Sequence, residues 1–166
     1  KQGKIRHIAI TNHRLAVAHE AIDSGIYVTL QFPFSYLAGE QEMALVRGCR
    51  EKNMGFIAMK GMAGGLIRDG FTAAAWMAQQ EGVVPIWGVQ RESELDEFLQ
   101  CIREGAELTD ERRATIERDR RELCGEFCRG CGYCMPCPAG IEINQCARMS
   151  LMLRRAPAAA WLTEEW

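Results

Sequence analysis

The sequence predicts an α/β fold in which short apolar strands alternate with helices. Four apolar segments of strand length occur before residue 90, and a stretch with the apolar spacing of a helix follows each of them. This alternation is typical of βαβ units with a parallel sheet. After Gly105 the composition changes and a run of cysteines appears, which predicts an appendage of a different kind.

The first two units have clear ends. Ile5–Thr11 is an apolar strand, and its helix carries apolar residues from Leu15 onward and stops at Gly25, a residue that commonly follows helix ends. The second strand is predicted over Tyr27–Phe32. Its helix is predicted over Glu40–Lys52 because Met43, Leu45, Val46 and Cys49 recur at helical spacing.

The next two units repeat the pattern. Phe56–Met59 is the third strand, and a glycine-rich turn separates it from a helix near Phe71–Gln80. Val83–Gly88 is the fourth strand, and Glu94–Arg103 forms its helix. Each strand–helix–strand connection should be right-handed, as is usual for parallel strands.

The unit length predicts half of a TIM (β/α)8 barrel. Units of about 25–30 residues suit that barrel, whose eight units need roughly 250 residues. An isolated half would expose two edge strands, which proteins usually avoid. Either two copies associate as a homo-oligomer, or the N-terminal half of the barrel is missing here. The start at Lys1, without Met and just before a strand, favours a fragment of a longer protein.

One short loop carries a cysteine at every third position: Cys128, Cys131, Cys134 and Cys137. Such gaps let a loop aim several thiolates at one centre, and Gly130 and Gly132 remove side-chain bulk from the turn. The nearest pattern is C-x2-C-x2-C-x3-C-P, which binds iron–sulfur clusters. This chain shortens the last gap by one residue and keeps the Cys-Pro ending. The run predicts a [4Fe–4S] cluster bound by the four thiolates.

Zinc and disulfides are the alternatives to a cluster. Structural zinc sites usually pair two C-x2-C knuckles about 15–20 residues apart, and disulfides belong to secreted proteins, whose signal is not recognisable here. The fourth ligand stays open between Cys137 and the reserves Cys124 and Cys146, because the Cys before Pro can serve another cluster. Cys49 and Cys101 lie in apolar helical patterns and are predicted to be buried.

The appendage is predicted to be helical and to occupy 106–166, after a half-barrel over 1–105. Thr109–Leu123 is rich in interleaved Arg and Glu, with Thr109 as N-cap, and predicts a solvated helix rather than a nucleic-acid surface. A last helix over Glu142–Arg155 is rich in Met and Leu and is predicted to pack over the cluster. The alternative is that this helix presents a binding surface lined by flexible methionine side chains.

Composition limits the partners. The 166 residues carry a formal net charge of −2, so no basic face indicates nucleic acid. The apolar runs are too short to predict a membrane span. The cysteines point to a reducing compartment, most simply the cytoplasm.

Four segments resemble the aldo/keto reductase family. Gly3–His13 (GKIRHIAITNH) resembles that family's segment G-K-[IV]-R-x-I-G-[VI]-S-N at the fifth barrel strand. Tyr27–Tyr36 is similar to the sixth strand, Phe56–Gly65 to the seventh strand and its loop, and Val84–Gln90 to the eighth. The cysteine region resembles the C-terminal 4Fe-4S, ferredoxin-type extension of one branch. The resemblance implies the second half of the barrel followed by an iron–sulfur appendage.

The resemblance also implies NADPH or NADH bound at the carboxyl ends of the strands. Thr11 and Asn12 match a Ser-Asn pair that holds the nicotinamide carboxamide, and Gln31 matches the glutamine that assists it. The structural alternative is that the first two only cap a strand end. Met59 stands where a ring-stacking Tyr is common, and Lys60 beside it either meets a phosphate or is solvated.

Three further positions concern the phosphates. Gly64 and Gly65 permit close backbone approach to a pyrophosphate. Arg91 lies where many relatives have a Lys-Ser run against a 2′-phosphate, so the choice between NADPH and NADH stays open. The family's catalytic Asp, Tyr, Lys and His come from strands outside this chain, and we nominate no catalytic residue. His13 is a candidate to face the substrate cleft.

The expected function is the C-terminal part of an NAD(P)H-dependent aldo/keto reductase, an oxidoreductase that reduces a small carbonyl substrate by hydride transfer. The chain alone should be inactive, and its metal-binding appendage would serve a redox partner or fasten the tail. The alternative is a ferredoxin-like electron-transfer or docking module on a half-barrel scaffold.

Overall fold

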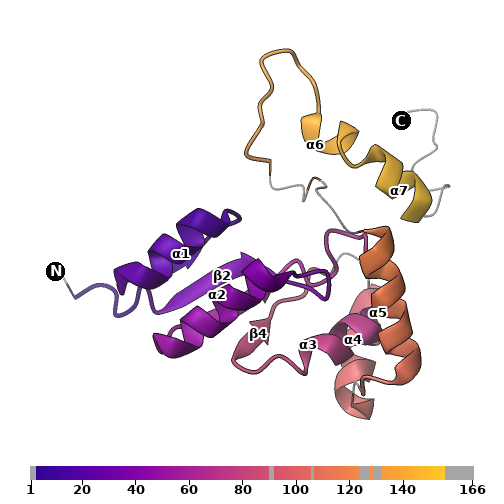
Figure 1. Ribbon diagram of the computed structural model, residues 1–166, viewed down its shortest axis with the longest axis horizontal. Coiled ribbons are helices and arrows are strands. Elements are labelled where there is room, and N and C mark those ends of the chain that lie inside the picture. The colour runs from indigo at the N-terminus through magenta and orange to yellow at the C-terminus, as the bar shows by residue number, and fades with distance from the viewer. Residues whose placement is uncertain (1–2, 90–91, 106, 124–127, 129–131, 156–166) are drawn as a thin grey trace.

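The computed structural model describes residues 3–89, 92–105, 107–123, 128 and 132–155 (Figure 1). Within them the chain forms a four-stranded parallel sheet in the order β1-β2-β3-β4. The strands are β1 (Ala9–Thr11), β2 (Thr29–Pro33), β3 (Gly55–Met59) and β4 (Val83–Pro85). Each strand pairs with the next one along the chain, as successive units of a (β/α)8 barrel do. The predicted α/β class and the parallel sheet are confirmed.

Four helices follow the strands in turn: α1 (Leu15–Ser24), α2 (Glu40–Glu51), α3 (Gly70–Met77) and α4 (Glu92–Glu104). They agree with the predicted helices to within a few residues. The two outer strands are shorter than predicted because each has a single neighbour in the sheet. At the end of β4, Pro85 has no N–H to donate, and the ladder closes with the Ile86 N–H on the Ala58 carbonyl at 2.9 Å.

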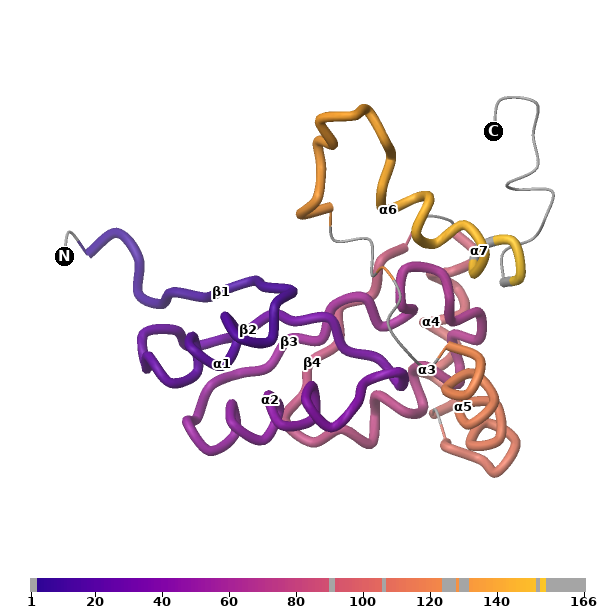
Figure 2. The backbone as a smooth tube through the Cα atoms, turned by 45° about the horizontal axis from the view of Figure 1, so that its top comes forward, coloured from indigo at the N-terminus to yellow at the C-terminus, as the bar shows by residue number. Residues whose placement is uncertain are grey.

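One face of the sheet is packed against helices. Along β2 and β3 alternate residues are buried, among them Leu30, Phe32, Phe56 and Ala58. They share a hydrophobic core with Ala18 and Ile22 of α1 and with Leu45, Val46 and Cys49 of α2. The two helices therefore cover the same face, as Figure 2 shows.

The opposite face is partly exposed among the described residues, although Met59 on this face is buried. Register places Thr11, Gln31, Ile57 and Val84 in one row across the four strands, on this second face. Val84 is 62% exposed. In a complete (β/α)8 barrel, this row would be a layer of the packed interior.

The helix α5 (Asp110–Glu122) packs onto the core formed by the sheet and its helices. Its N-cap is Thr109, as predicted, whose side chain accepts a hydrogen bond from the Arg112 N–H. Ile116 belongs to the core described above, and buried Asp119 accepts a hydrogen bond from the hydroxyl of Tyr36 at 2.5 Å. The predicted boundary after residue 105 stays a prediction, although α5 shares a core with the units before it.

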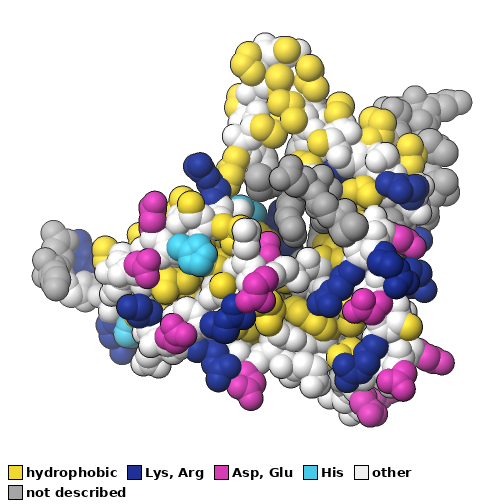
Figure 3. Space-filling view, in the orientation of Figure 1, with side chains coloured by type: hydrophobic (Ala, Val, Ile, Leu, Met, Phe, Trp, Pro, Cys, Tyr) yellow, Lys and Arg dark blue, Asp and Glu magenta, His cyan; other side chains and the backbone are white. Residues whose placement is uncertain are grey.

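The last predicted helix is wrong in one respect, because it is broken into α6 (Ile143–Cys146) and α7 (Met149–Arg155). At the break, the hydrogen bonds change from the i−4 type, Ala147 to Ile143, to the i−3 type, Arg148 to Gln145. Among the described helices, none has both the length and the apolar character needed to cross a membrane. On the face shown in Figure 3, basic and acidic side chains are interspersed.

Candidate functional site

The carboxyl ends of the strands bring the predicted nicotinamide contacts together. Thr11 and Gln31 are register partners on β1 and β2, and the Asn12 N–H donates to the Gln31 carbonyl at 3.0 Å. Gln31 Nε2 lies 3.5 Å from the Sδ atom of Met59, at the end of β3. Parallel strands end at one edge, which is why residues about 20 and 28 positions apart meet there.

The side chain of Asn12 has a structural role at this edge. Its Oδ1 accepts the Arg14 N–H at 2.5 Å, just before α1 begins at Leu15. Such Asx turns let a short amide side chain satisfy the backbone as it leaves a strand. The oxygen of the Asn12 amide therefore has a local structural partner, and its nitrogen makes no hydrogen bond to another described residue. Whether Asn12 also binds a carboxamide stays a prediction.

The loop from β3 to α3 has an unusual backbone. Lys60, Ala63, Gly64 and Gly65 have φ values of 56°, 50°, 67° and 89°. At Gly65 an added Cβ would meet nothing within 4 Å, so the backbone is open to an approaching group. Met59 is 7% exposed, whereas Lys60 is partly buried and interacts with other residues. The loop suits a phosphate-bearing ligand, but the contacts expected of these residues stay predictions.

The C-terminal appendage touches this edge at two places. Arg148, between α6 and α7, donates from Nη2 to the Gly64 carbonyl at 2.7 Å. Tyr133, from the cysteine loop, places its hydroxyl 3.2 Å from Nδ1 of His13, and the two rings meet edge to face. The appendage therefore lies over the carboxyl end of β1 and over the β3–α3 loop.

Sequence reasoning missed both appendage residues. Neither Tyr133, which lies within the cysteine run, nor Arg148 has a role predicted from the sequence. The one signal was a charged residue inside a segment rich in Met and Leu. Arg91, the predicted 2′-phosphate contact, lies outside the described residues.

The surroundings of His13 disfavour its charged form. Burial lowers the pKa of its imidazole, and the positive charge of Lys60 lowers it further. Its Nε2 atom and the Nε atom of Arg148 are buried without a hydrogen-bond partner among the described residues. Unpaired buried donors and acceptors are rare in folded proteins, and each marks a place where a partner atom belongs.

The cysteine loop is described only in part. Cys128 and Cys137 are partly buried and Cys134 is exposed, whereas Cys124 and Cys131 lie outside the described residues. Among the described side chains, no three Cys, His, Asp or Glu groups gather as a metal ion would require. The cluster assignment still depends on the cysteine spacing, and its fourth ligand stays open.

Two of the other cysteines behave as predicted. Cys49 is fully buried and Cys101 is 4% exposed, and neither forms a disulfide. Burial raises the pKa of the Cys49 thiol to about 11, so it is inert at neutral pH. Cys146, the reserve cluster ligand, is exposed on α6.

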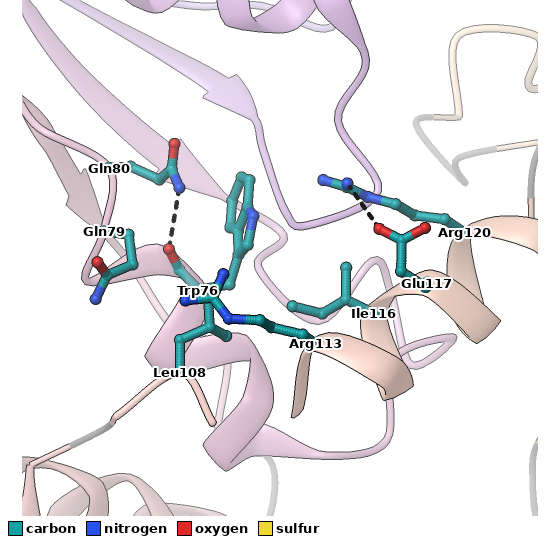
Figure 4. A pocket seen from close by; sticks show the side chains of 8 residues that line it. All are labelled: Trp76, Gln79, Gln80, Leu108, Arg113, Ile116, Glu117 and Arg120. Carbon is teal, nitrogen blue, oxygen red and sulfur yellow. Dashed lines mark hydrogen bonds and ion pairs between the residues drawn. The ribbon is translucent and has the colours of Figure 1, made fainter. Parts of the chain in front are cut away.

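A separate cleft of about 550 Å³ lies between α3 and α5 (Figure 4). It is lined by Trp76, Gln79, Gln80, Leu108, Arg113, Ile116, Glu117 and Arg120. Trp76 and Ile116 belong to the hydrophobic core, and Glu117 and Arg120 form an exposed ion pair. None of the predicted site residues lines this cleft, so its lining does not contribute to the carboxyl-edge site.

A family model described as "Aldo/keto reductase family" matches residues 1–74. The matched segment contains β1, β2 and β3 and ends within α3. It includes all the predicted nucleotide contacts except Arg91 and leaves the cysteine region unmatched. No curated protein shows significant similarity to the chain. The family match points to an oxidoreductase.

Proposed function

We propose that this chain forms the nucleotide-binding part of an NAD(P)H-dependent aldo/keto reductase. The match to residues 1–74 supports the reaction class. The observation that carries the proposal is the meeting of Asn12, Gln31 and Met59 at one edge of the sheet. Bound NAD(P)H would supply the hydride for a small carbonyl substrate.

The chain's own residues would bind and orient the nucleotide. Thr11, Gln31 and the amide nitrogen of Asn12 would hold the carboxamide, and the thioether of Met59 would cover one face of the ring. The backbone of Gly64 and Gly65, open at Gly65, would admit the phosphates, with Lys60 and Arg91 as cationic contacts.

The proton donor would come from outside this chain. We propose that four further βα units, the N-terminal half of the barrel, cover the second face of the sheet and carry the catalytic groups. The exposure of Val84 and Ile86, at 62% and 43%, supports a partner on that face. A second copy of the chain is the rival occupant. Gel filtration of the 166-residue chain tests it, since a strict monomer excludes the copy.

We further propose that the four spaced thiolates, Cys128, Cys131, Cys134 and Cys137, bind a [4Fe–4S] cluster in a reducing compartment such as the cytoplasm. The spacing supports this, and we assign the cluster no step in the reaction. Iron, acid-labile sulfide and zinc should be measured on anaerobically purified protein. One zinc and no sulfide per chain would overturn the assignment. If Cys146→Ser abolishes the visible sulfur-to-iron absorption band and Cys137→Ser preserves it, then Cys146 and not Cys137 is the fourth ligand.

Nucleotide binding is tested by titrating the protein made from its complete coding sequence. NADPH and NADH are added to the wild type, to Gln31→Ala and to the control Gln41→Ala, whose side chain is exposed on α2. Loss of a partly buried hydrogen-bond partner should weaken binding about tenfold for the first variant only. Equal affinity and turnover in all three proteins would remove Gln31 from the site.

A further inference from the structure

The two buried side-chain atoms without a partner among the described residues lie on the two edge contacts of the appendage. They are Nε2 of His13, which touches Tyr133, and Nε of Arg148, which holds the loop at Gly64. In a protein interior such atoms normally have a hydrogen-bond partner. Their position on both sides of the carboxyl edge indicates that a polar ligand belongs between the appendage and the sheet.

The Arg148 side chain is held in place for such a ligand. Its Nη2–H donates to the Gly64 carbonyl at 2.7 Å, so one part of the guanidinium is fixed while the Nε–H stays unpaired. A guanidinium carries five donors in a rigid fork that matches phosphate oxygens. An added Cβ at Gly64 would lie 3.1 Å from Nη2, so a glycine there also leaves room for the fork.

The surroundings favour an anion. Lys60, whose positive charge lowers the pKa of His13, places one cation near this edge in addition to Arg148. The backbone at Gly65 is open, with nothing within 4 Å of an added Cβ. Of the groups of a dinucleotide, the phosphates are the ones that combine negative charge with several acceptor oxygens.

We infer that Arg148, supplied by the appendage, binds a phosphate oxygen of the dinucleotide through its Nε–H while it holds the Gly64 carbonyl. The inference rests on the proposed nucleotide function and adds a ligand from outside the half-barrel. It gives the appendage a binding role that does not depend on electron transfer: it completes the nucleotide site. Release of the appendage should therefore weaken nucleotide binding.

The test compares Arg148→Ala, Arg148→Lys and the control Arg154→Ala in the protein made from its complete coding sequence. Arg154 is exposed on α7, the helix that begins just after Arg148, and its Nε donates only locally, to the Ser150 carbonyl at 3.0 Å. Binding of NADPH and of NADH is measured by calorimetry at two salt concentrations, and thermal unfolding checks the fold. Calorimetry reads binding directly and needs no turnover.

The expected result is binding about tenfold to a hundredfold weaker in Arg148→Ala, an intermediate loss in Arg148→Lys and no change in Arg154→Ala. Added salt should weaken wild-type binding more than that of Arg148→Ala, because the charge contact is screened. A role limited to holding Gly64 would leave the salt dependence unchanged, and that outcome overturns the inference.

The same binding measurements distinguish failure of the Arg148 inference from failure of the proposed nucleotide-binding function. If wild type binds nucleotide and Arg148→Ala binds it equally well, Arg148 is not a ligand and the proposed function stands. If wild type binds neither NADPH nor NADH, the proposed function fails and the inference fails with it.

Discussion

The hydrogen bond between Tyr36 and Asp119 should hold α5, and with it the start of the appendage, on the half-barrel. Tyr36 is fully buried and Asp119 is 2% exposed, and the carboxylate accepts the hydroxyl at 2.5 Å. Arg120 adds a second contact from its Nε to the Tyr36 carbonyl, at 2.7 Å. The hydroxyl can be removed without changing the ring, as Tyr36→Phe.

The magnitude follows from burial and charge. A hydrogen bond to an ionised group contributes about 1.5–3 kcal/mol to stability, and both groups here are buried. Tyr36→Phe should therefore lower the free energy of unfolding by about 2 kcal/mol. With a urea m-value of about 2 kcal/mol/M, the midpoint should fall by about 1 M.

A double-mutant cycle isolates this bond. Urea unfolding is measured for Tyr36→Phe, Asp119→Ala and the double variant, and the coupling should be about 1–3 kcal/mol. The control cycle replaces Tyr36→Phe by Tyr27→Phe, because the Tyr27 hydroxyl makes no hydrogen bond to another described residue. Its coupling to Asp119 should be near zero. Equal coupling in the two cycles would refute the reasoning.

Three further predictions concern stability. Gly61→Ala should destabilise the chain by about 1–3 kcal/mol in thermal unfolding, since its Cβ would collide with the Trp87 ring; an unchanged midpoint would contradict the packing. The raised pKa of buried Cys49 keeps its thiol protonated while the unfolded thiol, with a pKa of 9.0, ionises. Stability should thus fall by about 2 kcal/mol between about pH 8.5 and 10.5, and Cys49→Ala should lack this fall in urea unfolding. Asp69→Ala removes the N-cap that accepts the Thr72 N–H at 3.0 Å and should cost about 1 kcal/mol by the same assay. The exposed Asp96→Ala is its control, and equal losses would reject the cap.

Local sequence rules predicted the repeating units well because they read short-range patterns. Apolar spacing placed α1 and α2, and Gly25 ends α1 with a φ of 64° as expected of a helix C-terminus. The outer strands were predicted too long, because strand length depends on how far a neighbouring strand pairs. The break between α6 and α7 had no clear signal, since Ala147 and Arg148 are both compatible with a helix.

The candidate site was predicted in part. The contacts among Asn12, Gln31 and Met59 follow from strand ends that meet at one edge, which the alternation of strands and helices already implies. The approach of Arg148 to Gly64 joins residues 84 positions apart, and no pattern in either segment predicts it.

By itself, the sequence determined which segments are strands and helices, that the sheet is parallel, and which side chains stand at its carboxyl edge. These features follow from hydrophobic periodicity and turn residues, which act over a few positions. Only the tertiary structure decided that α5 is held by Tyr36 and that Tyr133 and Arg148 contact His13 and Gly64 at the carboxyl edge of the sheet. Such long-range contacts depend on how whole elements pack, because a hydrogen bond between distant residues forms only after burial has brought their backbones together.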